Sequence, residues 1–266
     1  MGARLGVVSY LNTRPLVEAL RTGAIDHDFE LVYDVPSICA DRLHKGETDV
    51  ALIPAAEVGR GEDLYKIVPN VGIVSHGPVN SVFVVLGDKA PEDIETLALD
   101  RGSRTSVVLS QIILARQYDC RPEVFVHVPN IDEMLECADA ALLIGDPALE
   151  LEQGRYRVLD LGNLWTQMTG LPFVYACWTG RDGALTADDV ARLVEAKDKG
   201  GSFVAKIADE YAVETDTLPP DFYADYLTRN ILYDLGEAEL EGMRLFYAYG
   251  CELGLFDSVP DIRFYK

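Results

Sequence analysis

The sequence has few of the residues that bind metals, and those stand apart from one another. Its 266 residues include five cysteines and four histidines. No two cysteines have the CxxC spacing of zinc ligands, and their odd number and wide separation do not indicate a disulfide framework. We expect the cysteines to be small core residues and predict no metal site. The cysteines are Cys39, Cys120, Cys137, Cys177 and Cys251, and the histidines are His27, His44, His76 and His127.

Positive charge is scarce as well. The chain has 23 lysines and arginines against 44 aspartates and glutamates, which gives a formal net charge of −21 at pH 7. Nucleic acids and anionic membranes bind proteins through clustered lysine and arginine, so a surface this acidic argues against both as partners. The charge favours solubility, and an anionic ligand has to be held by local donors and dipoles against the overall field.

Long apolar runs are absent too. No stretch approaches the roughly 20 apolar residues of a membrane-spanning helix, and the first residues enter a strand pattern without the apolar stretch of a signal peptide. We therefore expect a cytoplasmic protein. The sequence contains no repeats and no linker rich in glycine and serine, and its apolar fraction of 48% is typical of a globular protein.

The first part of the chain alternates strand and helix patterns. A first helix is predicted to begin at Pro15, with Thr13 as its cap, and a second to follow the cap Ser37 and end before Gly46. The order strand, helix, strand, helix, strand implies a parallel sheet with right-handed crossovers. The three predicted strands are 4–9, 29–34 and 49–54.

A second set of strands and helices lies between two long strand patterns, at 79–86 and 173–178. We predict a two-lobed α/β fold in which each lobe is a mainly parallel sheet flanked by helices. Residues 1–84 and 178–266 would form a discontinuous first lobe, residues 85–177 an inserted second lobe, and the two long strands a hinge. One doubly wound domain is the alternative. The other predicted strands are 96–99, 124–128 and 140–144, and the C-terminal helices lie near 186–197, 202–212, 221–233 and 237–253.

The candidate ligand sites are strand ends that lead directly into helices, because the first N–H groups of a helix are unpaired and attract anions. The segment 9–16 reads Ser-Tyr-Leu-Asn-Thr-Arg-Pro-Leu. Its Asn12 offers a donor and an acceptor in one planar group, and Tyr10, Leu11 and Thr13 stand beside it. Asn12 and Thr13 acting only as helix caps is the alternative.

A cluster of hydroxyl groups at 100–107 is the second candidate. The segment Asp-Arg-Gly-Ser-Arg-Thr-Ser-Val places Ser103, Thr105 and Ser106 where a glycine turn meets an amphipathic helix. Amides, helix dipole and hydroxyls can converge there on a carboxylate. An ordinary cap is the alternative, although three hydroxyls in four residues exceed what one cap needs. The segment is neither a Walker A loop nor a GxGxxG turn, so no nucleotide is predicted.

Two further segments complete the candidate site. Gly-Pro-Val-Asn-Ser at 77–81 brings Asn80 and Ser81 to the first long strand, and Ile-Gly-Asp-Pro-Ala at 144–148 brings Gly145 and Asp146 to another turn. Ser81 as a small residue in a crowded strand and Asp146 as a helix cap are the alternatives. None of these segments contains a conspicuous general base.

Taken together, these segments resemble the chorismate dehydratase family. The likeness runs in order over about the first two thirds of the chain. Its most specific part is Ser-Tyr-Leu-Asn at 9–12. The other matching segments are 46–54, 77–82, 103–106, 144–148, 159–162 and 171–176.

The resemblance implies a type II periplasmic-binding-protein-like fold used by a cytoplasmic lyase at the start of the futalosine route to menaquinone. Such an enzyme removes water from chorismate, a small dianion, to give 3-[(1-carboxyvinyl)oxy]benzoate without a metal or organic cofactor. The family's active-site asparagine and serine fall on Asn12 and Ser81. The predicted substrate-binding residues are Tyr10, Leu11, Thr13, Asn80, Ser103, Thr105, Ser106, Gly145 and Asp146.

The matched residues include no plausible base, so we expect the substrate's own enolpyruvyl carboxylate to take the ring proton. Two other functions are compatible with the same fold. One is a non-enzymatic small-anion-binding protein, which would need an export signal. The other is the sister enzyme of the pathway, which cleaves cyclic dehypoxanthine futalosine and opens on a different motif.

Overall fold

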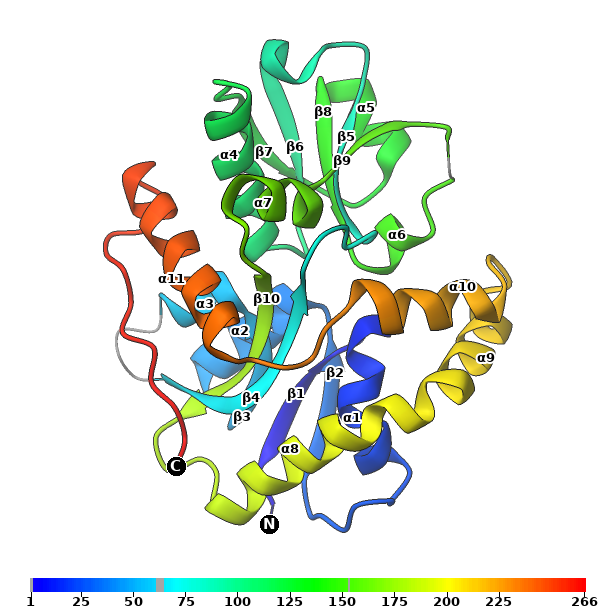
Figure 1. Ribbon diagram of the computed structural model, residues 1–266, viewed down its shortest axis with the longest axis vertical. Helices are drawn as coiled ribbons and strands as arrows, with labels where there is room; N and C mark the ends of the chain where they lie inside the picture. Colours follow the sequence, from blue (N-terminus) through cyan, green and yellow to red (C-terminus); the bar gives the residue numbers. More distant parts are fainter. Residues whose placement is uncertain (1, 61–64, 153) are drawn as a thin grey trace.

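The strands of the computed structural model, which describes residues 2–60, 65–152 and 154–266, form two separate sheets (Figure 1). We call each sheet, with the helices that cover it, a lobe. The first sheet contains, in spatial order, β2 (Glu30–Asp34), β1 (Arg4–Val8), β3 (Val50–Pro54), β10 (Phe173–Arg181) and β4 (Tyr65–Ser75). The second contains β7 (Glu123–His127), β6 (Thr96–Asp100), β8 (Ala140–Ile144), β5 (Val82–Leu86) and β9 (Arg157–Asp160).

The two sheets share one plan. In the first, β1 pairs in parallel with β2 and β3, and β10 runs antiparallel to β3 and β4. In the second, β6 pairs in parallel with β7 and β8, and β5 runs antiparallel to β8 and β9. The central strands β3 and β8 are buried throughout, as apolar strands covered on both faces should be.

Helices cover both faces of the sheets and continue into the C-terminal part of the chain (Figure 1). The first lobe carries η1 (Leu11–Thr13), α1 (Arg14–Arg21), α2 (Pro36–Lys45), α3 (Ala55–Val58) and α8 (Ala187–Gly200). The second carries η2 (Pro91–Asp93), α4 (Thr105–Gln117), α5 (Ile131–Cys137), α6 (Asp146–Leu149) and α7 (Leu161–Thr169). The chain ends with η3 (Gly201–Phe203), α9 (Val204–Thr215), α10 (Pro220–Asp225), the π-helical turn η4 (Tyr226–Asn230) and α11 (Glu237–Glu252). Helix α11 contacts both β10 and α4, and so joins the lobes.

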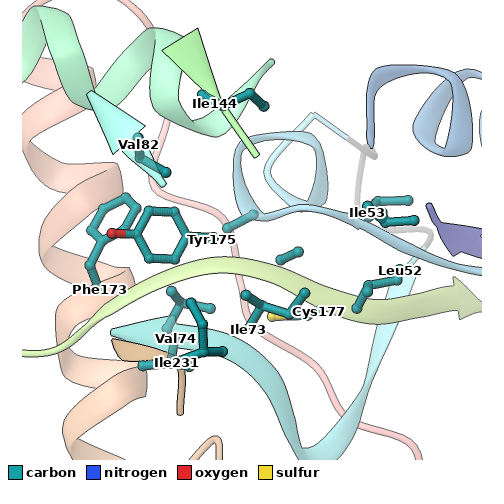
Figure 2. Close-up of a cluster of buried hydrophobic side chains, with 14 of the residues drawn as sticks. Leu52, Ile53, Ile73, Val74, Val82, Ile144, Phe173, Tyr175, Cys177 and Ile231 are labelled. Carbon is teal, nitrogen blue, oxygen red and sulfur yellow. The ribbon is translucent and has the colours of Figure 1, made fainter. Parts of the chain in front are cut away.

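One cluster of buried apolar side chains extends through both lobes. Figure 2 shows the part of it where the lobes meet, with Ile73 and Tyr175 of the first lobe near Val82 and Ile144 of the second. Such contact across the junction removes apolar surface of both lobes from water, at about 25 cal/mol per Å². The lobes are therefore held together by packing as well as by hydrogen bonds.

The predicted two-lobed α/β architecture is confirmed, with differences in detail. Strands β4 and β9 and helix α7 were not predicted from the sequence, and one strand of each sheet, β10 in the first and β5 in the second, runs antiparallel to the other four. Thr13 occupies the N-cap position of α1, but its side chain makes no capping hydrogen bond. Ser37 was wrong as a cap, because α2 begins at Pro36 and Val35 holds the N-cap position. Gly46 does end α2 in the left-handed conformation. The four C-terminal helices lie close to the predicted ranges, and α8 begins with a capping box of Thr186 and Asp189.

The strand patterns predicted as a hinge lie one in each sheet. Strand β5 belongs to the second sheet and β10 to the first, so the chain passes between the sheets at 76–81 and 161–172. The lobe boundaries at residues 84 and 178 and the hinge itself remain predictions. No helix in the described ranges is long and apolar enough to cross a membrane.

Candidate active site

A cavity lies between the lobes, where the carboxyl ends of the parallel strands β1, β3, β6 and β8 meet β10. Ligands bind at such strand ends in open α/β sheets. The cavity volume is about 60 Å³. Its lining is Val8, Tyr10, Asn12, Pro36, Pro54, Ile73, Val79, Ser81, Val82, Ser103, Arg104, Thr105, Ser106, Ile144, Gly145, Tyr175, Ala176 and Ile231. Figure 2 shows the apolar part of this lining around Tyr175.

Asn12 lies on this cavity, in the short turn η1 between β1 and α1. Its backbone carbonyl accepts a hydrogen bond from the Tyr233 hydroxyl over 3.0 Å. Its side-chain Oδ1 accepts from the Thr13 hydroxyl over 3.4 Å. Thr13 itself is buried and does not line the cavity, and its hydroxyl is directed at Asn12.

Ser81 also lines the cavity, just before β5, and is 1% exposed. Its hydroxyl accepts a hydrogen bond from the Tyr226 hydroxyl over 2.9 Å and points to the Val79 carbonyl at 3.5 Å. The Ser81 carbonyl accepts from the Gly145 amide over 2.8 Å, which fixes the turn after β8 beside it. Asn12 and Ser81 are thus brought together, although 69 positions separate 12 from 81 in the numbering.

The hydroxyl cluster at the start of α4 lies on the cavity as well, but its members differ. Thr105 Oγ1 donates to the Tyr175 carbonyl over 3.0 Å and accepts from the Ala56 amide over 3.1 Å, so its proton and one of its two lone pairs are used within the protein. Ser103 Oγ is buried and has no hydrogen-bond partner among the residues that the structure describes. A buried hydroxyl without a partner is costly, so Ser103 is the cluster's strongest candidate for a ligand contact.

Gly145 lines the cavity in a conformation with φ of +65°. A Cβ atom there would lie 2.5 Å from the Tyr10 ring, so the close packing of Tyr10 requires glycine. Tyr10 in turn forms part of the cavity wall.

Asp146 lies outside the cavity lining and connects the lobes. Its carboxylate accepts from the Leu11 amide over 2.9 Å, and the Tyr211 side chain also hydrogen-bonds it. Burial raises the pKa of Asp146 to about 6, although both hydrogen bonds and Arg14 oppose the shift. The alternative role of Asp146 as a helix cap is contradicted, since Gly145 holds the N-cap position of α6 and the helix has no side-chain cap.

Asn80 is exposed and lies on a separate surface hollow, beside Phe83 and Asp160. Its backbone amide and that of Val79 donate to the Asp160 carboxylate at 2.8 and 3.1 Å. Leu11 is fully buried. Leu11, Thr13, Asn80 and Asp146 thus surround the predicted site without lining its cavity.

The described residues that line the cavity include no aspartate, glutamate, histidine, lysine or cysteine. Arg104 is their one cation, and its Nε lies 3.7 Å from Glu57 Oε1. The carboxylate of Asp100 does not line the cavity, and burial raises its pKa. The cavity can therefore orient and hydrogen-bond an anion, but its own side chains offer no strong base.

Sequence reasoning did not identify two residues of this arrangement. Arg104 stood within the hydroxyl cluster but was not assigned to the site, although its charge was the available signal. Tyr226 comes from η4, and no local pattern marks it. Among the described residues, no group of three histidine, cysteine, aspartate or glutamate side chains is arranged to hold a metal ion.

Several solved structures share this fold. A protein of Archaeoglobus fulgidus superposes with a TM-score of 0.76 at 18% identity, covering 96% of this chain and 98% of that one. The periplasmic aliphatic sulphonate-binding protein SsuA of Escherichia coli gives a TM-score of 0.64 at 19% identity, covering 100% of this chain and 92% of that one. The predicted periplasmic-binding-protein-like fold is confirmed.

The sequence comparisons are more specific. The chorismate dehydratase of Thermus thermophilus is 26% identical over 260 residues, which cover 91% of this chain and 93% of the relative. A family model described as menaquinone biosynthesis matches residues 3–252. The chain therefore belongs to this menaquinone biosynthesis family.

Proposed function

We propose that the protein is a chorismate dehydratase, which converts chorismate into 3-[(1-carboxyvinyl)oxy]benzoate and water. The observation that carries this proposal is the match to the Thermus thermophilus enzyme over nearly the whole chain. The cavity supports it, because Asn12, Ser81 and Ser103 line it together with Arg104. Chorismate carries two carboxylates, so a site with donors and a cation suits it.

The chemistry fits a cavity without a base. In the elimination, one ring C–H bond breaks, its electron pair becomes part of the aromatic ring, and the ring C–O bond breaks to release hydroxide. We propose that the substrate's enolpyruvyl carboxylate accepts the ring proton, which then passes to the departing oxygen to complete water. Asn12 holds the enolpyruvyl side chain, and Ser81 hydrogen-bonds the departing oxygen. The protein contributes orientation and fixed dipoles, and aromaticity supplies the driving force.

Incubation of the purified protein with chorismate tests this proposal directly. We expect the loss of one water by mass and the ultraviolet spectrum of a substituted benzoate. Asn12→Ala is expected to lower kcat/KM by about 100-fold or more, as the loss of an oriented donor does at other active sites. Chorismate bound but returned intact would favour a binding protein, and no binding at all would contradict the assignment.

Asp100→Asn tests the absence of a protein base. Asp100 Oδ2 is buried and has no hydrogen-bond partner within the described ranges, so it is an alternative proton acceptor to test. Its side chain does not line the cavity, so we expect kcat to stay within about threefold of the wild type, well short of the effect of losing a general base. A variant that binds chorismate normally but does not turn it over would identify Asp100 as the base.

A further inference from the structure

Tyr226 lies behind the two proposed catalytic residues and contacts both. Its hydroxyl donates to Ser81 Oγ over 2.9 Å, and the Asn12 side chain hydrogen-bonds the same hydroxyl. Tyr226 is 3% exposed and opens the π-helical turn η4, a rare irregularity that often marks functional sites. The proposed function so far gives it no role.

The directions of these hydrogen bonds form one chain. Asn12 Oδ1 accepts from Thr13, which leaves the Asn12 amide N–H groups to donate to the Tyr226 oxygen. Tyr226 donates its hydroxyl hydrogen bond to Ser81 Oγ, so one acceptor site of the serine is occupied. The Ser81 proton has a partner among the described residues in the Val79 carbonyl, but at 3.5 Å this hydrogen bond is weak.

The burial of Tyr226 favours this direction of the hydrogen bonds. Tyr226 is surrounded by protein, and this desolvation raises the pKa of its phenol. The phenol therefore keeps its proton at neutral pH and acts as a donor to Ser81. Hydrogen bonds arranged in a chain polarise one another, so each donor along the chain strengthens the next.

We propose that Tyr226 is a positioning residue that hydrogen-bonds Ser81 and thereby directs the Ser81 proton to the departing hydroxyl group of the substrate. This inference rests on the proposed dehydration. Ser81 hydrogen-bonds the departing oxygen and keeps its own proton, so the elimination still balances with the ring proton as the one transferred. Tyr226 acts through Ser81 and does not itself touch the substrate.

Tyr226→Phe removes the hydroxyl and keeps the ring. We expect kcat for chorismate to fall about 10- to 100-fold while KM changes less than about threefold, because the lost hydrogen bond acts mainly as charge develops on the departing oxygen. Tyr265→Phe is the matched control. Tyr265 is also buried and donates to the Arg181 carbonyl over 2.6 Å, at the end of β10 away from the cavity. An unchanged kcat in Tyr226→Phe would overturn the inference.

A double-mutant cycle separates positioning from general structural support. In a Ser81→Ala background, Tyr226→Phe is expected to change kcat by less than about twofold, because its target hydroxyl is already gone. A further loss of about tenfold or more would mean that Tyr226 acts independently of Ser81, and the inference would be wrong.

A fluorinated tyrosine at position 226 keeps the hydroxyl in place and changes its acidity. It therefore tests the hydrogen bond from Tyr226 to Ser81 even if Tyr226→Phe does not fold. We expect kcat to change with the acidity of the phenol, and an unchanged kcat contradicts the inference. The wild-type protein separates the two proposals. If it does not dehydrate chorismate, the proposed function fails; if it does, the variants alone decide the role of Tyr226.

Discussion

Arg104 is the residue that sets the charge of the cavity. It is the one cation among the described lining residues, in a chain whose net charge is −21. Glu57 lies beside it. Burial alone would raise the pKa of Glu57, but His44 and Arg60 outweigh this and lower it, so Glu57 stays a carboxylate and helps to orient the guanidinium. Arg104 is thus placed to bind a carboxylate of the substrate.

Arg104→Gln is expected to raise KM for chorismate about 10- to 100-fold with a smaller effect on kcat, since a charged hydrogen bond contributes about 1.5–3 kcal/mol. Arg104→Lys should recover part of this loss because it restores the charge without the planar fork. Arg116→Gln is the control, because Arg116 lies on the same helix α4 and pairs with Glu252 away from the cavity. Steady-state kinetics of the three variants measures the effect, and an unchanged KM in Arg104→Gln would exclude this role.

Residues whose roles depend on partners far along the chain limit what the sequence can predict. Asp146 was expected to cap a helix or bind a ligand, whereas its partner Leu11 lies 135 positions away. Tyr226 meets Ser81 across 145 positions. Local patterns find strand ends and helix starts, and they located Asn12, Ser81, Ser103 and Gly145 on the cavity because such ends meet at one edge of a sheet.

At the scale of secondary-structure elements, Thr105 connects two helices and a strand. It begins α4 in the second lobe, and its hydroxyl bonds the Tyr175 carbonyl of β10 and the Ala56 amide of α3 in the first lobe. The sequence predicted this hydroxyl as a substrate contact. In the folded protein it holds the start of α4, and with it the neighbouring Ser103, against the first lobe.

Thr105→Val removes the hydroxyl and preserves the shape, so two buried backbone groups lose their partner. Each such loss destabilises by about 1–3 kcal/mol. We expect the midpoint of thermal unfolding to fall by roughly 5–15 °C, at about 2–4 °C per kcal/mol for a chain of this size. Thr105→Ser keeps the hydroxyl and should retain most of the stability. Equal midpoints for Thr105→Val and the wild type would show that this connection contributes nothing.

The unpredicted elements have a common physical explanation. Strand β4 contains Pro69, followed by Asn70 with φ of +62°, and both interrupt the apolar alternation by which strands are predicted. Strand β9 is four residues long and only partly buried. Both form edges of their sheets, where pairing on one side permits weak patterns. The buried strands β3, β8 and β10, which are continuous apolar runs, were all predicted from sequence.

At the scale of the whole molecule, the described form is closed. Pockets that enclose small ligands have volumes of about 300–1,000 Å³. The cavity here has about 60 Å³. A substrate of the size of chorismate does not fit this volume, so we predict that the lobes move apart to admit it and that the contacts between them oppose this movement. These contacts include Asp146 with Leu11 and Glu150 with the Tyr223 hydroxyl.

Asp146 makes this closed form sensitive to pH. Its pKa in the folded protein, about 6, lies above the ordinary value of 3.8, so folding favours the protonated acid. The resulting stabilisation is complete below pH 3.8 and is lost as the pH rises through 6. Glu150 raises this pKa and Arg14 lowers it, but burial dominates.

Asp146→Asn removes the titration while keeping an oxygen that can accept from the Leu11 amide. Between pH 5 and pH 8, we expect the difference in unfolding free energy between variant and wild type to shift in favour of the variant by about 1–2 kcal/mol, because only the wild type has to bury a charge at the higher pH. Asp88→Asn, at an exposed aspartate of the second lobe, should show no such shift. Denaturant unfolding at the two pH values measures it. A difference that does not vary with pH would mean that Asp146 ionises freely in the folded protein, and closure would then have to be held by the neutral contacts around Thr105 and Tyr226.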